Sequence, residues 1–92
     1  MNTRQLQDEL EAFARERDWT QFHSPKNLAM ALSVEAAELL EHFQWLTEDQ
    51  SHKIDAKTRS AVSEEIADVQ IYLLRLADVL SIDIETAVSK KI

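Results

Sequence analysis

The sequence contains no glycine among its 92 residues and a single proline, Pro25. Glycine supplies the positive backbone angles of tight hairpin turns and the close backbone approach of phosphate-binding loops. A β-rich fold and a glycine-rich nucleotide loop are therefore both disfavoured. Apolar residues make up 45% of the chain, which is ample for a folded core. We predict one all-α domain that spans residues 1–92.

Capping residues and apolar periodicity divide the chain into helices. Ser24 followed by Pro25 is an N-cap with proline at the first helical position, and it predicts a helix as far as about Leu46. Before it, Thr3 is expected to cap a helix that continues to about Asp18. The expected inner face of that first helix consists of Leu6, Leu10, Phe13 and Arg17.

The second half of the chain predicts one long helix between two short ones. Residues 47–50 fit a capping box and indicate a short helical turn. A polar loop over 50–58 then leads into a long helix from about 56 to 80. Ser81 or Asp83 is expected to cap a last helix that continues to the final residue.

Charge and residue usage exclude several classes of function. Ten Lys and Arg against 17 Asp and Glu give a formal net charge of −7, which argues against a nucleic acid polymer as the partner. The absence of cysteine excludes disulfides, zinc–thiolate sites and thiol catalysis. No run of sequence is apolar enough for a signal peptide or a membrane span, so we expect no membrane partner and a cytoplasmic location.

Four acidic residues occupy positions where apolar residues are expected. Glu35 and Glu38 lie on the second helix, and Glu65 and Asp68 lie on the long helix. At about 100° per residue, Glu35 and Glu65 fall at the centre of their apolar stripes. Burying unpartnered carboxylates costs several kcal/mol each and raises their pKa values. A hard cation such as Mg²⁺, with Mn²⁺ as a substitute, would neutralise them.

Other interpretations of these acids remain open on spacing alone. The four residues could lie on a solvated helix edge, or pair with Lys and Arg across an interface. A di-iron site would need Glu-x-x-His pairs, and no histidine of this chain has Glu three residues before it. Acids off the stripes, such as Glu11 and Glu64, are expected to be ordinary surface charge.

The two acidic helices share a sequence pattern. An offset of 30 residues places Glu35 over Glu65 and Glu38 over Asp68, with apolar residues matching around them. This regularity indicates either a pseudo-symmetric pair of facing helices or chance similarity between two amphipathic helices.

Several short runs carry a more specific signal. They are Arg17-Asp18-Trp19, Phe22-His23-Ser24-Pro25-Lys26-Asn27-Leu28, Glu35-Ala36-Ala37-Glu38-Leu39, Phe43-Gln44-Trp45 and Glu64-Glu65-Ile66-Ala67-Asp68-Val69 with Tyr72-Leu73. In this order they resemble the MazG-like nucleotide pyrophosphatases, most closely the branch that contains the dCTP pyrophosphatases. The signature of that family is E-x-x-E, a spacer and E-x-x-D.

The resemblance implies an all-α, four-helix bundle-like fold that assembles as a homodimer or a dimer-of-dimers tetramer. It implies Mg²⁺-dependent hydrolysis of a (deoxy)nucleoside triphosphate such as dCTP to the monophosphate and pyrophosphate, for house-cleaning of nucleotide pools. Glu35, Glu38, Glu65 and Asp68 become the expected metal ligands, and Glu38 is the candidate for the general base.

The resemblance also suggests residues that contact the nucleotide. The aromatic candidates for the base and sugar are Trp19, Phe22, Trp45 and Tyr72, unless these side chains only cap the core. His23 either contacts the ligand or only orients its loop, and Lys26 or Asn27 contacts the ligand or caps the helix. Lys91 stands where a phosphate-contacting lysine is expected, and the family's following tail is expected to be missing here.

Two functions compete with the enzyme. One is a non-catalytic module that binds nucleotides, and the other is a structural helical dimerisation module. Ile71 and Leu74 favour the latter, because they lie opposite the acidic stripe, where apolar surface needs a partner.

Overall fold

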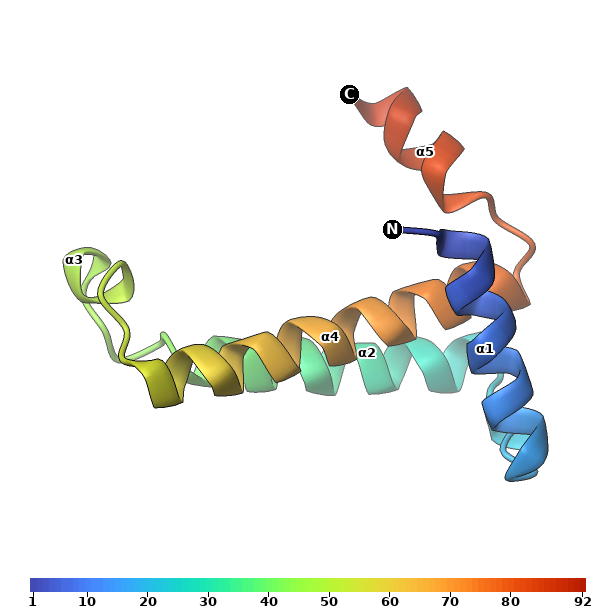
Figure 1. The fold of residues 1–92 in the computed structure, drawn as a ribbon, viewed down its shortest axis with the longest axis horizontal. Helices are drawn as coiled ribbons and strands as arrows, with labels where there is room; N and C mark the ends of the chain where they lie inside the picture. The colour runs from blue at the N-terminus through green and yellow to red at the C-terminus, as the bar shows by residue number, and fades with distance from the viewer.

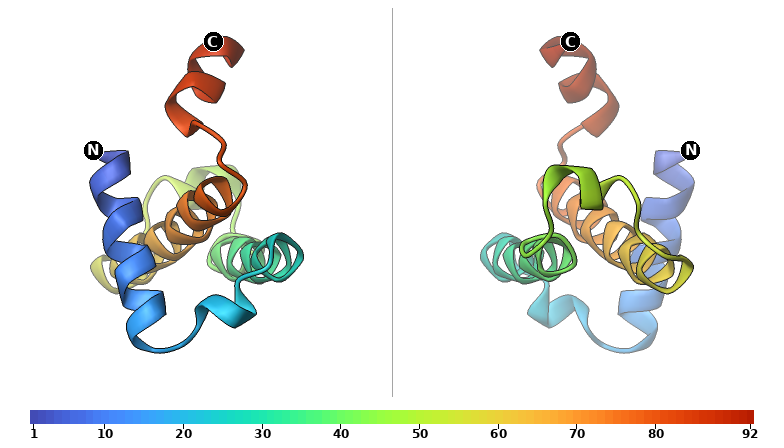
Figure 2. Two further views of the ribbon diagram at one scale, coloured as in Figure 1. Left: turned by 90° about the vertical axis from the view of Figure 1, so that its right-hand side faces the viewer. Right: turned by 90° about the vertical axis from the view of Figure 1, so that its left-hand side faces the viewer.

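The computed structural model describes residues 1–92 and is helical throughout (Figure 1). Its elements are α1 (Thr3–Glu16), the 3₁₀ helix η1 (Thr20–Phe22), α2 (Pro25–Glu41), α3 (Glu48–Ser51), α4 (Ala56–Val79) and α5 (Ile84–Lys91). The long helices α2 and α4 lie side by side and run in opposite directions. Helix α1 crosses the end of this pair, α3 lies at the opposite end, and α5 projects away from it (Figure 2). The all-α prediction is confirmed.

The predicted capping signals define most helix starts. Ser24 Oγ accepts from the Asn27 amide at 3.1 Å at the start of α2. Thr47 and Gln50 form the expected capping box of α3. Helix α4 begins after Asp55 and ends at Val79, as predicted, and Asp83 rather than Ser81 caps α5.

Two predicted helix ends are wrong. Helix α2 ends at Glu41, five residues before the expected Leu46, because the chain tightens into turns over 42–45 and Thr47 becomes extended to cap α3. At the N-terminus the cap is Asn2 and not Thr3, since Asn2 Oδ1 accepts from the Gln5 amide at 2.9 Å. Thr3 is buried in the first turn of α1 instead.

The inner face of α1 is also different from the prediction. Its buried residues are Thr3, Gln7 and Ala14. Of the predicted face, Leu6 and Leu10 are half-buried, whereas Phe13 and Arg17 are exposed. Gln7 Nε2 donates to the carbonyl oxygen of Leu74 at 3.0 Å and joins α1 to α4. Leu74 is therefore 2% exposed and covered within the chain, so it is not the partner surface that its sequence position suggested.

Two helices of this glycine-free chain end in the left-handed conformation that glycine usually adopts. Asp18 after α1 has φ 58° and Ser81 after α4 has φ 56°. In each case the next residue closes a Schellman motif, with Trp19 N bonded to Ala14 O and Ile82 N bonded to Ala77 O, both at 2.8 Å. Because neither residue is glycine, a Cβ atom crowds the backbone at both positions, and the local backbone is strained.

The single chain encloses a small core. Only 8 of 92 residues are buried, which is too few for a self-sufficient helical bundle of this size. The radius of gyration is 15.3 Å, against about 12 Å for a compact domain of this length. Large apolar side chains remain exposed on both long helices, including Met30, Val34 and Ile66. None of the helices combines the length and hydropathy needed to cross a lipid bilayer.

The strain at Ser81 predicts a stabilising substitution. Ser81→Gly should raise the free energy of unfolding by about 0.5–1 kcal/mol, because glycine adopts φ 56° without a Cβ clash. The matched control is Ser60→Gly, an exposed interior position of α4, which should lower stability by about 0.5 kcal/mol. Urea denaturation of the three proteins measures both changes, and equal losses at the two sites would contradict the assignment.

Candidate metal centre

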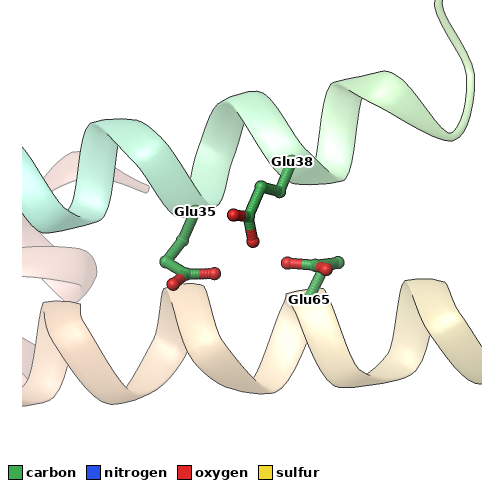
Figure 3. Close-up of side chains that lie close together, drawn as sticks. All are labelled: Glu35, Glu38 and Glu65. Carbon is green, nitrogen blue, oxygen red and sulfur yellow. The ribbon is translucent and has the colours of Figure 1, made fainter.

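Three carboxylates converge between the two long helices. Glu35 and Glu38 point from α2 toward α4, and Glu65 points back from α4 toward α2 (Figure 3). One carboxylate oxygen from each residue lies within 4.8 Å of the other two. The antiparallel packing of α2 and α4 explains why these carboxylates lie together, because an i, i+3 pair on one helix then faces the corresponding pair on the other.

Two oxygens of these half-buried carboxylates are shielded from water and lack partners. Glu35 Oε2 and Glu65 Oε2 are both buried and make no hydrogen bond. Burial raises the pKa of Glu35 to about 7, and the neighbouring Glu38, Asp68 and Glu65 carboxylates add to the shift. Burial and the charge of Glu38 likewise raise the pKa of Glu65. Buried unpartnered oxygens are rare in folded proteins, so the cluster requires protons or a cation.

The surrounding side chains do not supply that cation. No Lys or Arg forms an ion pair with the cluster. His42 is the nearest basic group, with Nε2 at 4.0 Å from Glu65 Oε1. An all-oxygen donor set with two free buried oxygens fits a hard divalent ion, so the cluster could bind a metal.

Asp68 lies at the edge of this group. It is one turn beyond Glu65 on α4, and its charge raises the pKa values of both Glu35 and Glu65. Its oxygens are outside the set that meets within 4.8 Å. The structure therefore gathers three of the four predicted ligands and places the fourth beside them.

The predicted nucleotide-contacting residues are spread more widely. Trp19 packs edge-to-face on Phe13 with ring centroids 5.4 Å apart, and Arg17 lies over the same Phe13 ring. Phe22 is 60% exposed before α2, and Trp45 is 86% exposed after it. Tyr72 is half-buried on α4, one turn beyond Asp68.

The predicted polar contacts also lie apart from the acids. Lys26 and Asn27 are in the first turn of α2, and Lys91 ends α5. All three are exposed. Asn27 Nδ2 donates to the carbonyl oxygen of Phe22 at 3.0 Å, which ties the start of α2 to the preceding loop. The structure does not bring these side chains together with the carboxylates in one chain.

One polar cluster was not expected from the sequence. Glu11, assigned to the surface, forms an ion pair with Arg75, and Arg75 Nε donates to His23 Nδ1 at 3.0 Å. Arg75 is 5% exposed. A possible signal was the position of Arg75 within an apolar stripe, because a buried guanidinium requires acceptors from neighbouring elements.

The raised pKa of Glu35 predicts how the metal-free protein responds to pH. Because the folded state binds this proton more tightly than the unfolded chain, the stability contributed by Glu35 is complete below about pH 4.5. It is lost as the pH rises through about 7. We expect Glu35→Gln, which cannot ionise, to flatten the fall in melting temperature between about pH 5 and pH 8 in EDTA.

Glu64→Gln is the control for this measurement, because Glu64 is exposed and adjacent to the cluster residue Glu65. It should retain the pH dependence of the unaltered protein. Parallel curves for all three proteins would show that Glu35 ionises normally.

Comparisons with known proteins show what this chain is similar to. The profile of the MazG-like family matches residues 30–92. The dCTP pyrophosphatase 1 of Mus musculus is 48% identical over 81 residues, and that of Homo sapiens is 46% identical over 81 residues. Each alignment covers 86% of this chain and 48% of the relative. The chain thus spans about half the length of these curated relatives.

A solved structure extends the comparison to the whole fold. The crystal structure of a pyrophosphatase from Archaeoglobus fulgidus superposes with a TM-score of 0.92 at 44% sequence identity. The superposition covers 99% of this chain and 85% of that chain, so the similarity includes all the helices described above. On these matches, the chain belongs to the MazG-like family.

Proposed function

We propose that this chain hydrolyses a nucleoside triphosphate to the monophosphate and pyrophosphate, with the help of Mg²⁺. The observation that carries the proposal is the pair of buried, unpartnered oxygens on Glu35 and Glu65 within a cluster of three carboxylates. The similarity to dCTP pyrophosphatase 1 supports dCTP as the first substrate to test. Such an activity would suit house-cleaning of a cytoplasmic nucleotide pool.

The proposed metal ligands are Glu35, Glu38, Glu65 and Asp68. Carboxylate oxygens are hard donors, which favours Mg²⁺ and allows Mn²⁺ as a substitute. When bound, a divalent cation would neutralise phosphate oxygens and the charge that develops at the α-phosphorus. An anionic substrate could then approach a protein whose net charge is −7.

Glu38 is the proposed general base. It belongs to the cluster, and the pKa shifts of Glu35 and Glu65 both depend on its charge. In the proposed reaction a water oxygen forms a bond to the α-phosphorus, and the bond from that phosphorus to the bridging oxygen breaks. Glu38 accepts the proton from the water, and pyrophosphate leaves.

The proposed base and sugar contacts are Trp19, Phe22, Tyr72 and Trp45, with His23, Lys26, Asn27 and Lys91 as polar partners. Trp19 and Trp45 flank the 17 residues of α2, which span about 25 Å. The two tryptophans therefore lie at opposite ends of α2 in one chain. If both contribute to one site, they come from different copies.

The exposed apolar surface supports assembly with further copies. Met30 and Val34, at 51% and 56% exposure, lie one turn apart on α2, and Ile66 is exposed on α4. Apolar side chains of this size clustered on helices commonly mark interfaces. We infer a homodimer or a dimer of dimers that covers them.

Turnover tests the proposed chemistry directly. Pyrophosphate release from a panel of NTPs and dNTPs should require Mg²⁺ and be greatest with dCTP. Glu38→Gln should lower kcat by at least about 100-fold while nucleotide binding persists, because the amide cannot accept the proton. Glu35→Ala should abolish metal-dependent activity, and the exposed neighbour Glu64→Gln should retain it.

Other outcomes favour the competing functions. Thermal stabilisation by nucleotide and Mg²⁺ without product would indicate a binding module. No response to either ligand would leave structural dimerisation. Full activity of Glu38→Gln would remove Glu38 from the role of base.

Light scattering coupled to size exclusion tests the assembly. The measured mass should be two or four times 10.6 kDa. Val34→Glu should lower the apparent mass, because it places a charge in the proposed apolar interface. Gln5→Glu adds the same charge to the exposed surface of α1 and should leave the mass unchanged. A monomer in the unaltered protein would contradict the inference.

A further inference from the structure

A buried arginine joins three segments at the end of the helix pair away from α3. Arg75 extends from α4 and is 5% exposed. Its Nη1 donates to Glu11 Oε2 on α1, and its Nε donates to His23 Nδ1 in the connection before α2. Glu11 is held from its other side by Arg15, whose Nε donates to Glu11 Oε1 at 2.7 Å.

The bond between Arg75 and His23 determines where the imidazole carries its proton. A guanidinium Nε–H can only donate, and it stays protonated at any physiological pH. His23 Nδ1 must therefore accept, at 3.0 Å, so the neutral ring carries its hydrogen on Nε2. The Nε2–H remains available as a donor to another molecule.

The charges around His23 favour the neutral ring. Burial lowers the pKa of His23, and the positive charge of Arg75 lowers it further, while the Glu11 carboxylate opposes the shift. Arg75 also lowers the pKa of Glu11, so this pair stays ionised beside the ring. A second proton on His23 would have to displace the Arg75 hydrogen bond.

The network lies on the same helix face as the acids. Arg75 follows Asp68 by seven residues on α4, two turns or about 10 Å along one face. His23 belongs to the connection that also carries Trp19 and Phe22. That connection is otherwise held by local contacts, including the bond from Gln21 Nε2 to the Asp18 carbonyl oxygen at 2.9 Å.

We propose that Arg75 is a positioning residue for nucleotide binding: it anchors the connection between α1 and α2 and fixes His23 as a neutral imidazole with its hydrogen on Nε2. Arg75 acts through His23 and not on the reacting atoms. Its consequence for binding rests on the proposed function, whereas its effect on the His23 ring can be measured without any substrate.

Arg75→Lys separates the two bonds that Arg75 makes. The lysine Cε methylene stands where arginine has Nε–H, so the donor to His23 is lost while a cation remains for Glu11. Arg15→Lys is the matched control, because it makes the same exchange at the exposed partner of Glu11. Comparison of the two variants removes any general effect on the Glu11 ion pair.

The first measurement is nitrogen NMR of the imidazole side chains, with the His23 signals assigned from the spectrum of His23→Gln. Unaltered protein and Arg15→Lys should show a single tautomer of His23, with hydrogen on Nε2, from about pH 6.5 to pH 8. Arg75→Lys should show a mixture of tautomers. Hydrogen on Nδ1 in the unaltered protein, or an unchanged ring in Arg75→Lys, would overturn the proposal.

The second measurement is steady-state pyrophosphate release. Arg75→Lys should raise KM about tenfold and leave kcat within about twofold, since the lost bond orders the binding connection and not the chemistry. Arg15→Lys should match the unaltered protein in both constants. A lower kcat at constant KM, or no change, would overturn the positioning role. Absence of turnover in the unaltered protein would refute the proposed enzyme, and the NMR result would then decide the role of Arg75.

Discussion

The convergence of carboxylates between α2 and α4 is the interaction on which the arrangement of this protein depends. Two long helices pack against each other along stripes that contain Glu35, Glu38 and Glu65 at their centre. Packing that would ordinarily be apolar here encloses like charges, and two oxygens are left without a partner. Protons or a cation that compensate this charge would therefore stabilise the contact. The stability of the helix pair is in this way linked to what the cluster binds.

Helix α1 is joined to the end of this pair by directional polar contacts. Gln7 bonds the backbone at Leu74, and Arg75 pairs with Glu11. Both contacts lie where α1 crosses α4 (Figure 2). Directional bonds of this kind fix the position of an element even where little apolar area is buried. They place the connection before α2 at one end of the acidic face.

The small core of the chain and its exposed apolar residues have the same origin. A pair of long helices presents two broad faces, and α1 covers only one end of one of them. Met30 and Val34 on α2 and Ile66 on α4 are consequently exposed in the single chain. A fold of this shape leaves apolar residues exposed on surfaces that another molecule can cover.

Predictions that depend on residues a few positions apart are more accurate than predictions that depend on the path of the backbone or on distant contacts. Capping by Ser24 and Thr47 depends on residues three positions away, and both caps form as predicted. The predicted end of α2 is five residues too late, because the apolar pattern continues through Phe43 and Leu46 although the backbone has already turned. Apolar periodicity reports which side of a segment is buried, and it does not report whether the backbone remains helical.

In the candidate metal centre, too, the spacing within each helix was predictable from the sequence, and the contacts between helices were not. Spacing within each helix placed Glu35 and Glu65 on inward faces, and the resemblance to the MazG-like family added the expectation that all four acids form one site. The sequence by itself thus determined the order of the α-helices, the caps of α2 and α3 and the acidic stripes, because each depends on residues within a few positions. Only the tertiary structure decided that Glu38 joins the cluster closely and Asp68 borders it, and that Glu11 meets Arg75 and His23. Those contacts join residues more than 25 positions apart, and their geometry depends on how α1, α2 and α4 pack.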